Sequence, residues 1–358
     1  MSSYHAFRFL FLLLVCSTVP VVAANVALRV REGLASQMLT GYTRGADGQP
    51  LAGVGISARA EDSTITTTVY SGDDGFFAFP KLNAGKYDLW TLAVGFGTKR
   101  AKVSLRTKAT HQQDFALAAI EDFSWQLSGT EWLAALPDDT PENRRMKEVF
   151  RNRCTECHTA ATVLENRFDE AGWRVMVRVM SHTDYFGIMA PRKAAAVWVH
   201  HEEELVSFLT RMRGPGPSPM KFKPYPRPRG EAARVVVTEY DMPAGETPDK
   251  LNITTGEDWS FGTPAIVGVG SGVHDVHVDP DGNAWTSESG MNMGRTYVRI
   301  DTKTGDMEAY KVPAPDGRFA RGAHAVISDP SGHMWFDIRA QAGLTGFGDL
   351  GRVNLKTR

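Results

Sequence analysis

The chain has 358 residues, of which 40 are Lys or Arg and 41 are Asp or Glu, so its formal net charge is −1. This balance excludes the broad basic field that attracts nucleic acid, and it also excludes a strongly acidic solvating tail. The length exceeds what one hydrophobic core usually organises, so we expect a multidomain protein with two or three domains.

The N-terminus has the composition of a targeting segment. Arg8 precedes an apolar stretch over residues 9–22, and small residues follow up to Ala24. This charged, apolar, small order predicts a secretory signal peptide over residues 1–24. A lipoprotein signal at Cys16 is less favoured, because Val15 is a poor residue before a lipidated cysteine. No later segment has the roughly 18 consecutive apolar residues of a membrane span, so we expect a periplasmic or secreted protein.

Residues 37–118 have the pattern of a small β-sandwich. Runs rich in β-forming residues alternate with turn signals at 47–50, 72–75 and 83–85. The motifs Asp47-Gly48-Gln49-Pro50-Leu51-Ala52-Gly53-Val54 and Ser71-Gly72-Asp73-Asp74-Gly75-Phe76-Phe77 resemble those of the carboxypeptidase regulatory-like domain. The resemblance implies a prealbumin-like or carbohydrate-binding-like fold with a structural or adhesive accessory role, and makes carbohydrate a candidate partner.

Three amphipathic helices are predicted over residues 138–213. Thr140 and Pro141 suit the N-cap and first position of one helix, and a second is expected from Asp169. A third is expected from Glu202, with three glutamates in its first turn. Their apolar residues recur at helical spacing: Met146, Val149, Phe150, Trp173, Met176, Val177, Met180, Leu205, Phe208, Leu209 and Met212.

A five-residue motif, Cys154-Thr155-Glu156-Cys157-His158, follows the first of these helices. Loss of the signal peptide removes Cys16 and leaves only these two thiols. Two cysteines at this spacing add across the two vinyl groups of a porphyrin, and a His directly after them ligates the iron. Half a zinc site and a redox dithiol are the alternatives, but the first lacks partner ligands and the second lacks a βαβ pattern. We therefore expect one covalent haem c bound through Cys154 and Cys157, with His158 as proximal ligand.

This region also resembles the monohaem cytochrome c family, an all-α fold. The resemblance implies a methionine from the loop before the last helix as sixth iron ligand, which makes Met189 the first candidate. Met180 is the second, although it also continues the apolar face of its own helix, and His182 is the third. Arg174, Arg178 and Arg192 are either solvated surface charges or partners of haem propionates.

A proline-rich linker over residues 214–233 precedes a repeat that fills residues 234–358. Residues 273–285 match residues 323–335 at an offset of 50, and each copy is a strand, an Asp-Pro-x-Gly turn and a strand ending in Trp. A repeat of this length with short strands is typical of a β-propeller. Residues 238–243 look like an isolated copy of the outermost strand of one repeat. Because two repeats cannot close a ring of about 4–8 blades, we expect the chain to be a fragment of a longer protein.

These units resemble the streptogramin lyase (virginiamycin B lyase) repeat, and the resemblance implies catalysis by His274 and Glu288 with a magnesium ion. Packing within the repeat is the plainer interpretation of both His274 and its counterpart His324. We expect an exported c-type cytochrome that transfers electrons with a protein partner or a small-molecule reductant. The alternatives are a lyase-like propeller enzyme with an accessory haem domain, and a carbohydrate- or surface-binding protein.

Overall fold

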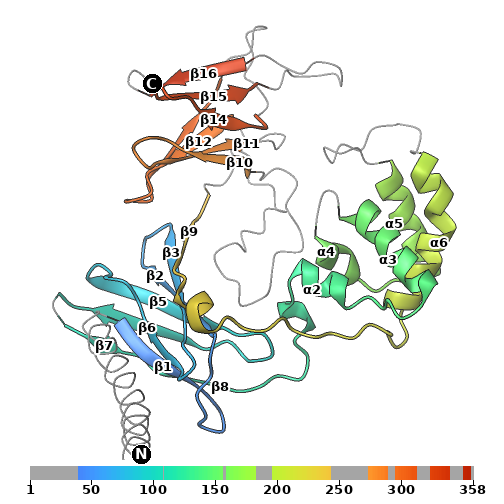
Figure 1. Cartoon of the computed structure of the whole chain (residues 1–358), viewed down its shortest axis with the longest axis horizontal. Helices are drawn as coiled ribbons and strands as arrows, with labels where there is room; N and C mark the ends of the chain where they lie inside the picture. The colour runs from blue at the N-terminus through green and yellow to red at the C-terminus, as the bar shows by residue number, and fades with distance from the viewer. Residues whose placement is uncertain are drawn as a thin grey trace, which may run out of the picture. The chain divides into compact units, whose positions relative to one another are not determined.

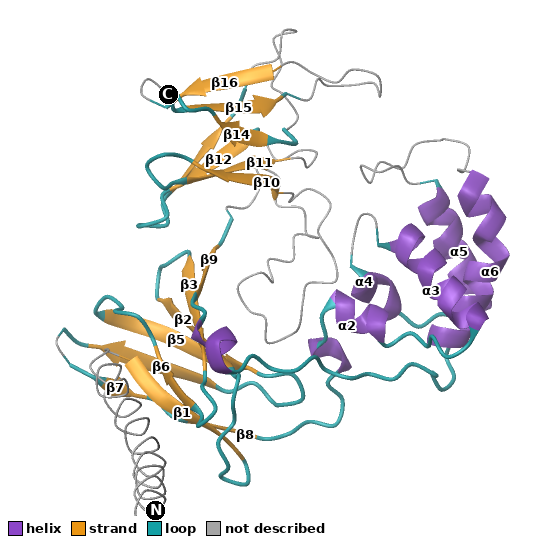
Figure 2. Cartoon of the chain, in the orientation of Figure 1, coloured by secondary structure: helices purple, strands orange, loops and turns teal. Residues whose placement is uncertain are grey.

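A computed structural model describes residues 39–107, 109–155, 159–182, 196–242, 273–288, 295–312, 323–338 and 350–355. Within them the chain divides into two compact units. One comprises residues 39–62, 66–120 and 227–238, and the other takes the remaining described residues. Strands dominate the structure, and the α-helices gather in residues 121–226, as Figures 1 and 2 show.

The first unit is the predicted β-sandwich. One sheet joins β1 (Leu39–Gly45) to β4 (Phe76–Ala78), β7 (His111–Gln112) and β8 (Phe115–Leu117). The other has the order β6 (Arg100–Leu105), β5 (Gly85–Leu92), β2 (Gly55–Ala60), β3 (Ile65–Tyr70) and β9 (Val237–Tyr240). Alternate residues of both sheets point inward and form one apolar core, which includes Leu39, Ile56, Phe77, Phe79, Leu89 and Leu117.

Turn chemistry in this unit matches the sequence signals. Asp47 accepts a hydrogen bond from the backbone of Gln49, and Gly48 has a φ of 80°. Gly75 also has a φ of 80°, and a Cβ atom there would lie 2.4 Å from the carbonyl oxygen of Thr43. Glycine is therefore required where this turn approaches β1.

Strand β9 differs from the sequence prediction. Its residues were expected to belong to the repeat, as an outermost strand, but the structure pairs β9 with β3 in the sandwich sheet. A short run such as Val237-Thr238-Glu239-Tyr240 has strong strand propensity but carries no information about its partner, so it pairs with an open sheet edge. The predicted linker over residues 214–233 contains a boundary between the two units, because residues up to Pro226 belong to one unit and residues 227–238 to the sandwich unit.

The helical part contains η1 (Ser124–Gln126), α2 (Gly129–Ala134), α3 (Pro141–Cys154), α4 (Ala160–Leu164), α5 (Glu170–Ser181) and α6 (Ala196–Arg213). Thr140 caps α3 by accepting from the Asn143 backbone at 3.1 Å, and Asp169 caps α5 by accepting from Gly172 at 2.8 Å. Both predicted helix starts are thus confirmed. Helix α6 begins at Ala196, well before the predicted start at Glu202.

The described residues between 273 and 355 form two antiparallel sheets. The first contains β10 (Val273–Val278), β11 (Ala284–Glu288), β12 (Tyr297–Ile300) and β13 (Met307–Tyr310) in that order. The second contains β14 (Val326–Ser328), β15 (His333–Asp337) and β16 (Leu350–Asn354). An apolar cluster that includes Trp285, Tyr297, Val326, Met334, Phe336 and Val353 lies between them. A further short 3-10 helix, η2 (Gly230–Arg234), precedes β9.

The sequence repeat is also a structural repeat. The indole nitrogen of Trp285 donates to Asp279 at 2.8 Å, and that of Trp335 donates to Asp329 at 2.7 Å. In each copy the same aspartate also accepts backbone hydrogen bonds from its own turn. The Asp-Pro-x-Gly turn and the following Trp are therefore one hydrogen-bonded unit that occurs twice.

Candidate functional site

Cys154 is the last residue of α3 and is half-buried. The Thr155 hydroxyl donates to the carbonyl oxygen of Arg151 at 2.7 Å and so helps to end the helix at this point. Three other predicted site residues, Cys157, His158 and Met189, lie outside the described residues. The structure therefore places the first thiol of the motif at the end of a packed helix.

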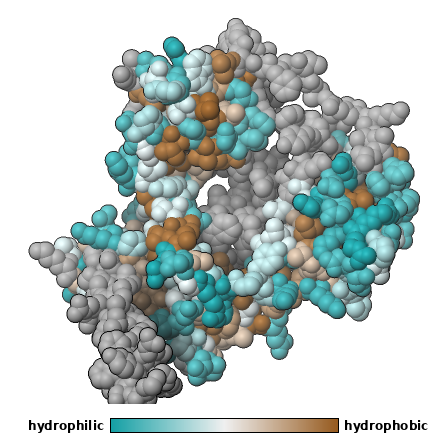
Figure 3. All heavy atoms as spheres, viewed as in Figure 1, coloured by the Kyte–Doolittle hydropathy of each residue, from teal (hydrophilic) through white to brown (hydrophobic). Residues whose placement is uncertain are grey.

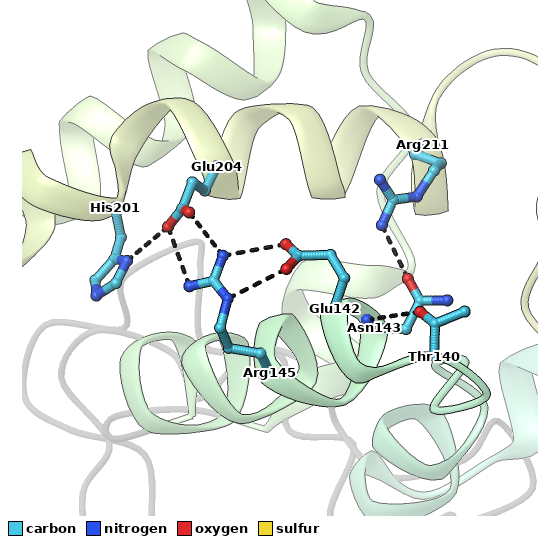
Figure 4. A network of polar contacts seen from close by, with 7 residues as sticks. All are labelled: Thr140, Glu142, Asn143, Arg145, His201, Glu204 and Arg211. Atoms are coloured by element: carbon cyan, nitrogen blue, oxygen red, sulfur yellow. Dashed lines mark hydrogen bonds and ion pairs between the residues drawn. The ribbon is translucent and has the colours of Figure 1, made fainter.

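The orientation of α3 is set by its contact with α6. Met146 and Phe150 are buried on the inner side of α3, and Arg145 forms a 2.6 Å ion pair with Glu204 of α6. Figure 4 shows that Arg145 lies between two carboxylates, with Glu142 on its own helix at 3.1 Å. His201 donates to Glu204 at 2.9 Å.

These contacts change the acidity of Glu204. Hydrogen bonds from Arg145 and from His201 stabilise its ionised form and lower its pKa to about 2. Hydrogen bonds to Glu142, and then to Glu204, raise the pKa of Arg145 above its ordinary value. The carboxylate and guanidinium groups are thus charged over the whole physiological pH range.

The neighbouring glutamates of α6 hold α5 in the same way. Glu202 accepts from Arg178 at 2.7 Å, and Glu203 pairs with Arg174. The sequence leaves these two arginines as either propionate partners or solvated charges, and in the structure both pair with carboxylates of α6. The sequence placed the glutamates at a helix N-terminus. Because α6 begins earlier, they instead lie within the helix and join it to two neighbours.

Helix α5 has both buried and exposed apolar side chains among the described residues. Trp173 and Val177 are buried, whereas Val175 and Met176 are exposed. Met180, the alternative ligand, is half-buried near the end of this helix. An apolar helix face left open to water is unfavourable unless another group covers it.

Arg213, at the end of α6, is a buried cation that the sequence analysis did not identify. Its guanidinium lies over the Trp132 ring at 5.2 Å and donates to the carbonyl oxygen of Glu165 at 3.3 Å. Burial, followed by the nearby charge of Arg167, lowers its pKa. Its carbonyl oxygen accepts from the Trp173 indole at 3.2 Å. Arg213 therefore stabilises the junction of α2, α5 and α6.

A second group of polar residues lies at one end of the two repeat sheets. The rings of His274 and His324 stack with centroids 3.4 Å apart, and His274 donates to the carbonyl oxygen of His324 at 2.8 Å. Glu288 is fully buried and lies 3.5 Å from Arg295. Burial raises the pKa of Glu288, and the charge of Arg295 partly offsets this.

Two further observations bear on possible functions. Among the residues that the structure describes, His, Cys, Asp and Glu side chains form no group of three or more that could hold a metal ion. Each helix in the described part of the chain is too short or too polar to cross a membrane.

Comparisons with known proteins identify the N-terminal part. Residues 38–118 match the family model of the carboxypeptidase regulatory-like domain, which supports the predicted sandwich over 37–118. No curated protein matches the chain. Among solved structures, the Bacillus anthracis TIE protein matches at 17% identity over 23% of this chain and 16% of its own, with a TM-score of 0.21. The chain thus corresponds to well under two thirds of that protein.

Proposed function

We propose that residues 138–213 form a cytochrome c-like domain that binds one covalent haem c and transfers electrons. The observation that carries the proposal is the position of Cys154. It ends α3, which α6 holds in place through Arg145 and Glu204, and the remaining motif residues follow directly in the chain. A thiol on a fixed helix end can present a constant geometry to a vinyl group.

Each part of this domain has a distinct task in the proposal. Cys154 and Cys157 hold the porphyrin covalently, His158 ligates the iron, and Met189 supplies the sixth ligand. The exposed Val175 and Met176 of α5 provide an apolar surface that excludes water from the ring. When bound, the haem supplies reversible one-electron chemistry.

The test is expression of the chain, including residues 1–24, in a host with a cytochrome c maturation system. The proposal expects haem that stays attached to the polypeptide after denaturation, and a reduced-minus-oxidised spectrum of the c type. Cys154→Ala and Cys157→Ala together should abolish attachment. Cys16→Ala alone serves as a control, because Cys16 lies in the predicted signal peptide and its loss should leave haem attachment unchanged. A folded protein without covalent haem would refute the proposal.

Export is part of the same proposal. Residues 1–24 are proposed to direct the chain to the periplasm or the medium, where haem attachment takes place. Cell fractionation with an N-terminal sequence of the mature protein tests this directly. Recovery of a cytoplasmic protein that retains residue 1 would contradict it.

We further infer that the two sheets of residues 273–355 are β-propeller blades. A four-stranded antiparallel sheet, a 50-residue repeat and the packing of one sheet on the next all support this assignment. For the sandwich we propose a carbohydrate-binding-like fold with an accessory role. Glycan-array binding by the intact chain is its test, and absence of any glycan binding would leave only the structural role.

A streptogramin lyase-like enzyme is the second candidate. The observation in its favour is that His274 and Glu288 lie at the same end of neighbouring strands, since Val273 pairs with Glu288 across β10 and β11. Glu288 is, however, fully buried and paired with Arg295, which argues against its acting as a free catalytic carboxylate. Loss of C–O lyase activity with a lactone substrate in His274→Ala, but not in a Cys154→Ala variant, would establish the lyase.

A further inference from the structure

Each of the two repeat sheets has two faces that carry different residues. Paired residues on neighbouring antiparallel strands lie on one face, and adjacent residues alternate between faces. We call face A of the first sheet the side that carries His277, Trp285 and Tyr297, and face B the side that carries Val276, Val278 and Ala284. The repeat then places Ile327, Trp335 and Leu350 on face A of the second sheet, and Val326, Met334 and Phe336 on its face B.

Face A of the first sheet packs against face B of the second. The rings of Tyr297 and Phe336 have centroids 4.7 Å apart, and His277 hydrogen-bonds to Ser328 at 2.7 Å. Trp285 is only 1% exposed in this contact. Because two different faces meet, the contact is heterologous, and such a contact can be repeated with further sheets of the same kind.

The next contact in this series would join two surfaces that are each partly exposed among the described residues. On face A of the second sheet, Ile327 is 59% exposed and Leu350 is 68% exposed. On face B of the first sheet, Val276 is 57% exposed and Val278 is 56% exposed. Figure 3 shows apolar residues reaching the visible surface of this part of the molecule.

The open surfaces are also complementary in chemistry. By the 50-residue offset, Ile327 of the second sheet is the equivalent of His277 in the first sheet. Likewise, Val278 of the first sheet is the equivalent of Ser328 in the second, and His277 and Ser328 meet in the internal contact. A hydrogen-bonded polar pair inside the chain thus corresponds to an apolar pair at the open surfaces. Leu350 is the equivalent of Tyr297 by strand register. Leu350 pairs with Asp337 and Tyr297 pairs with Ser287, and Asp337 and Ser287 are equivalent residues of the repeat.

We propose that the chain associates head to tail with a second copy of itself, with face A of the second sheet docked on face B of the first sheet in the next copy. The contact is centred on β10, because Val298 and Ile300 of the same face are already buried. Burial of the four exposed aliphatic side chains on both surfaces drives the association. This inference is independent of haem binding.

The test uses two variants of the full chain, Leu350→Glu on face A and Val278→Glu on face B, studied by sedimentation velocity at increasing concentration. The wild-type chain should form species larger than a monomer, and each variant alone should be monomeric. An equimolar mixture should give a 1:1 dimer and nothing larger, because one intact face of each kind remains. Val199→Glu, at an exposed position of α6, is the matched control and should associate like the wild type.

Circular dichroism of each variant shows whether the fold is retained, since both substituted side chains are exposed in the monomer. A wild-type chain that stays monomeric at high micromolar concentration would overturn the proposal. Association of Leu350→Glu at wild-type strength would also overturn it, as would a mixture of the two variants that remains monomeric.

Discussion

Arg145 of α3 and Glu204 of α6 form an ion pair 2.6 Å long between helices whose sequences are separated by the whole of α4 and α5. The pair lies on the surface, with both side chains 43% exposed. A single ion pair on the surface contributes little to stability, but here Glu142 and His201 extend the pair to a network of four side chains. The helix that presents Cys154 is thus held by a charged network that weakens only when strong acid protonates Glu204.

We predict that Glu204→Gln lowers the free energy of unfolding, and that the size of this loss depends on pH. The pKa of Glu204 is lowered from 4.5 to about 2, so its contribution is complete above about pH 4.5 and disappears as the pH falls towards 2. The midpoint temperature of thermal unfolding should be lower for the variant than for the wild type at pH 7, and the two midpoints should coincide near pH 2. Added salt should narrow the difference at pH 7, because salt screens exposed charges.

The control for this prediction is Glu148→Gln. Glu148 also lies on α3, but its partner Arg151 is on the same helix at 3.6 Å. At pH 7, the unfolding midpoint of Glu148→Gln should differ less from that of the wild type than the midpoint of Glu204→Gln does. An equal loss in both variants would mean that the contact between α3 and α6 has no special role.

The proposed iron ligand can be tested through the reduction potential of the haem. Met/His ligation raises the potential relative to His/His ligation, so Met189→His should lower it. Met180→Leu preserves the apolar volume on α5 and should leave the potential close to that of the wild type. A shifted potential in the Met180 variant, with none in the Met189 variant, would reverse the assignment. Potentiometric titration of the holoprotein provides the measurement.

The two copies of the Trp–Asp unit should differ in energetic importance. Trp285→Phe removes a hydrogen bond to the buried Asp279 and should cost about 1–3 kcal/mol. Trp335→Phe removes the equivalent bond to Asp329, whose carboxylate is more open to water, and should cost clearly less. Urea unfolding monitored by near-ultraviolet circular dichroism compares the two, and a larger loss for Trp335→Phe would contradict the prediction.

Glu131 should be a strong point of stability in the helical part. It is buried, accepts from the backbone and hydroxyl of Ser128 at 2.8 Å each, and accepts from the Tyr225 backbone at 2.6 Å. Glu131→Ala leaves these donors unpaired and should cost about 1–3 kcal/mol. Amide hydrogen exchange should accelerate at Ser128 and Tyr225, whereas Glu148→Ala should leave it unchanged there. Unchanged exchange in Glu131→Ala would refute the prediction.

Local features of the chain could be predicted because they depend on neighbouring residues. The helix caps Thr140 and Asp169, the Asp47–Gln49 turn and the repeated Trp–Asp unit all arise from groups within six positions of one another. The start of α6 was predicted incorrectly. Its three glutamates resemble an acidic first turn, but their carboxylates are instead ion-paired with α3 and α5, and no local signal distinguishes the two arrangements.

By itself, the sequence determined the β-sandwich of residues 37–118, the cap positions of two helices, the 50-residue repeat and the proposal of a haem at Cys154, Cys157 and His158. These follow from spacing, turn chemistry and periodicity, which act over a few residues. Only the tertiary structure decided that β9 pairs with β3, that Glu204 meets Arg145, and that unlike faces of the two repeat sheets pack together. Each of these joins segments far apart in the chain, and their pairing depends on which edges, charges and apolar faces remain open after the local elements have formed.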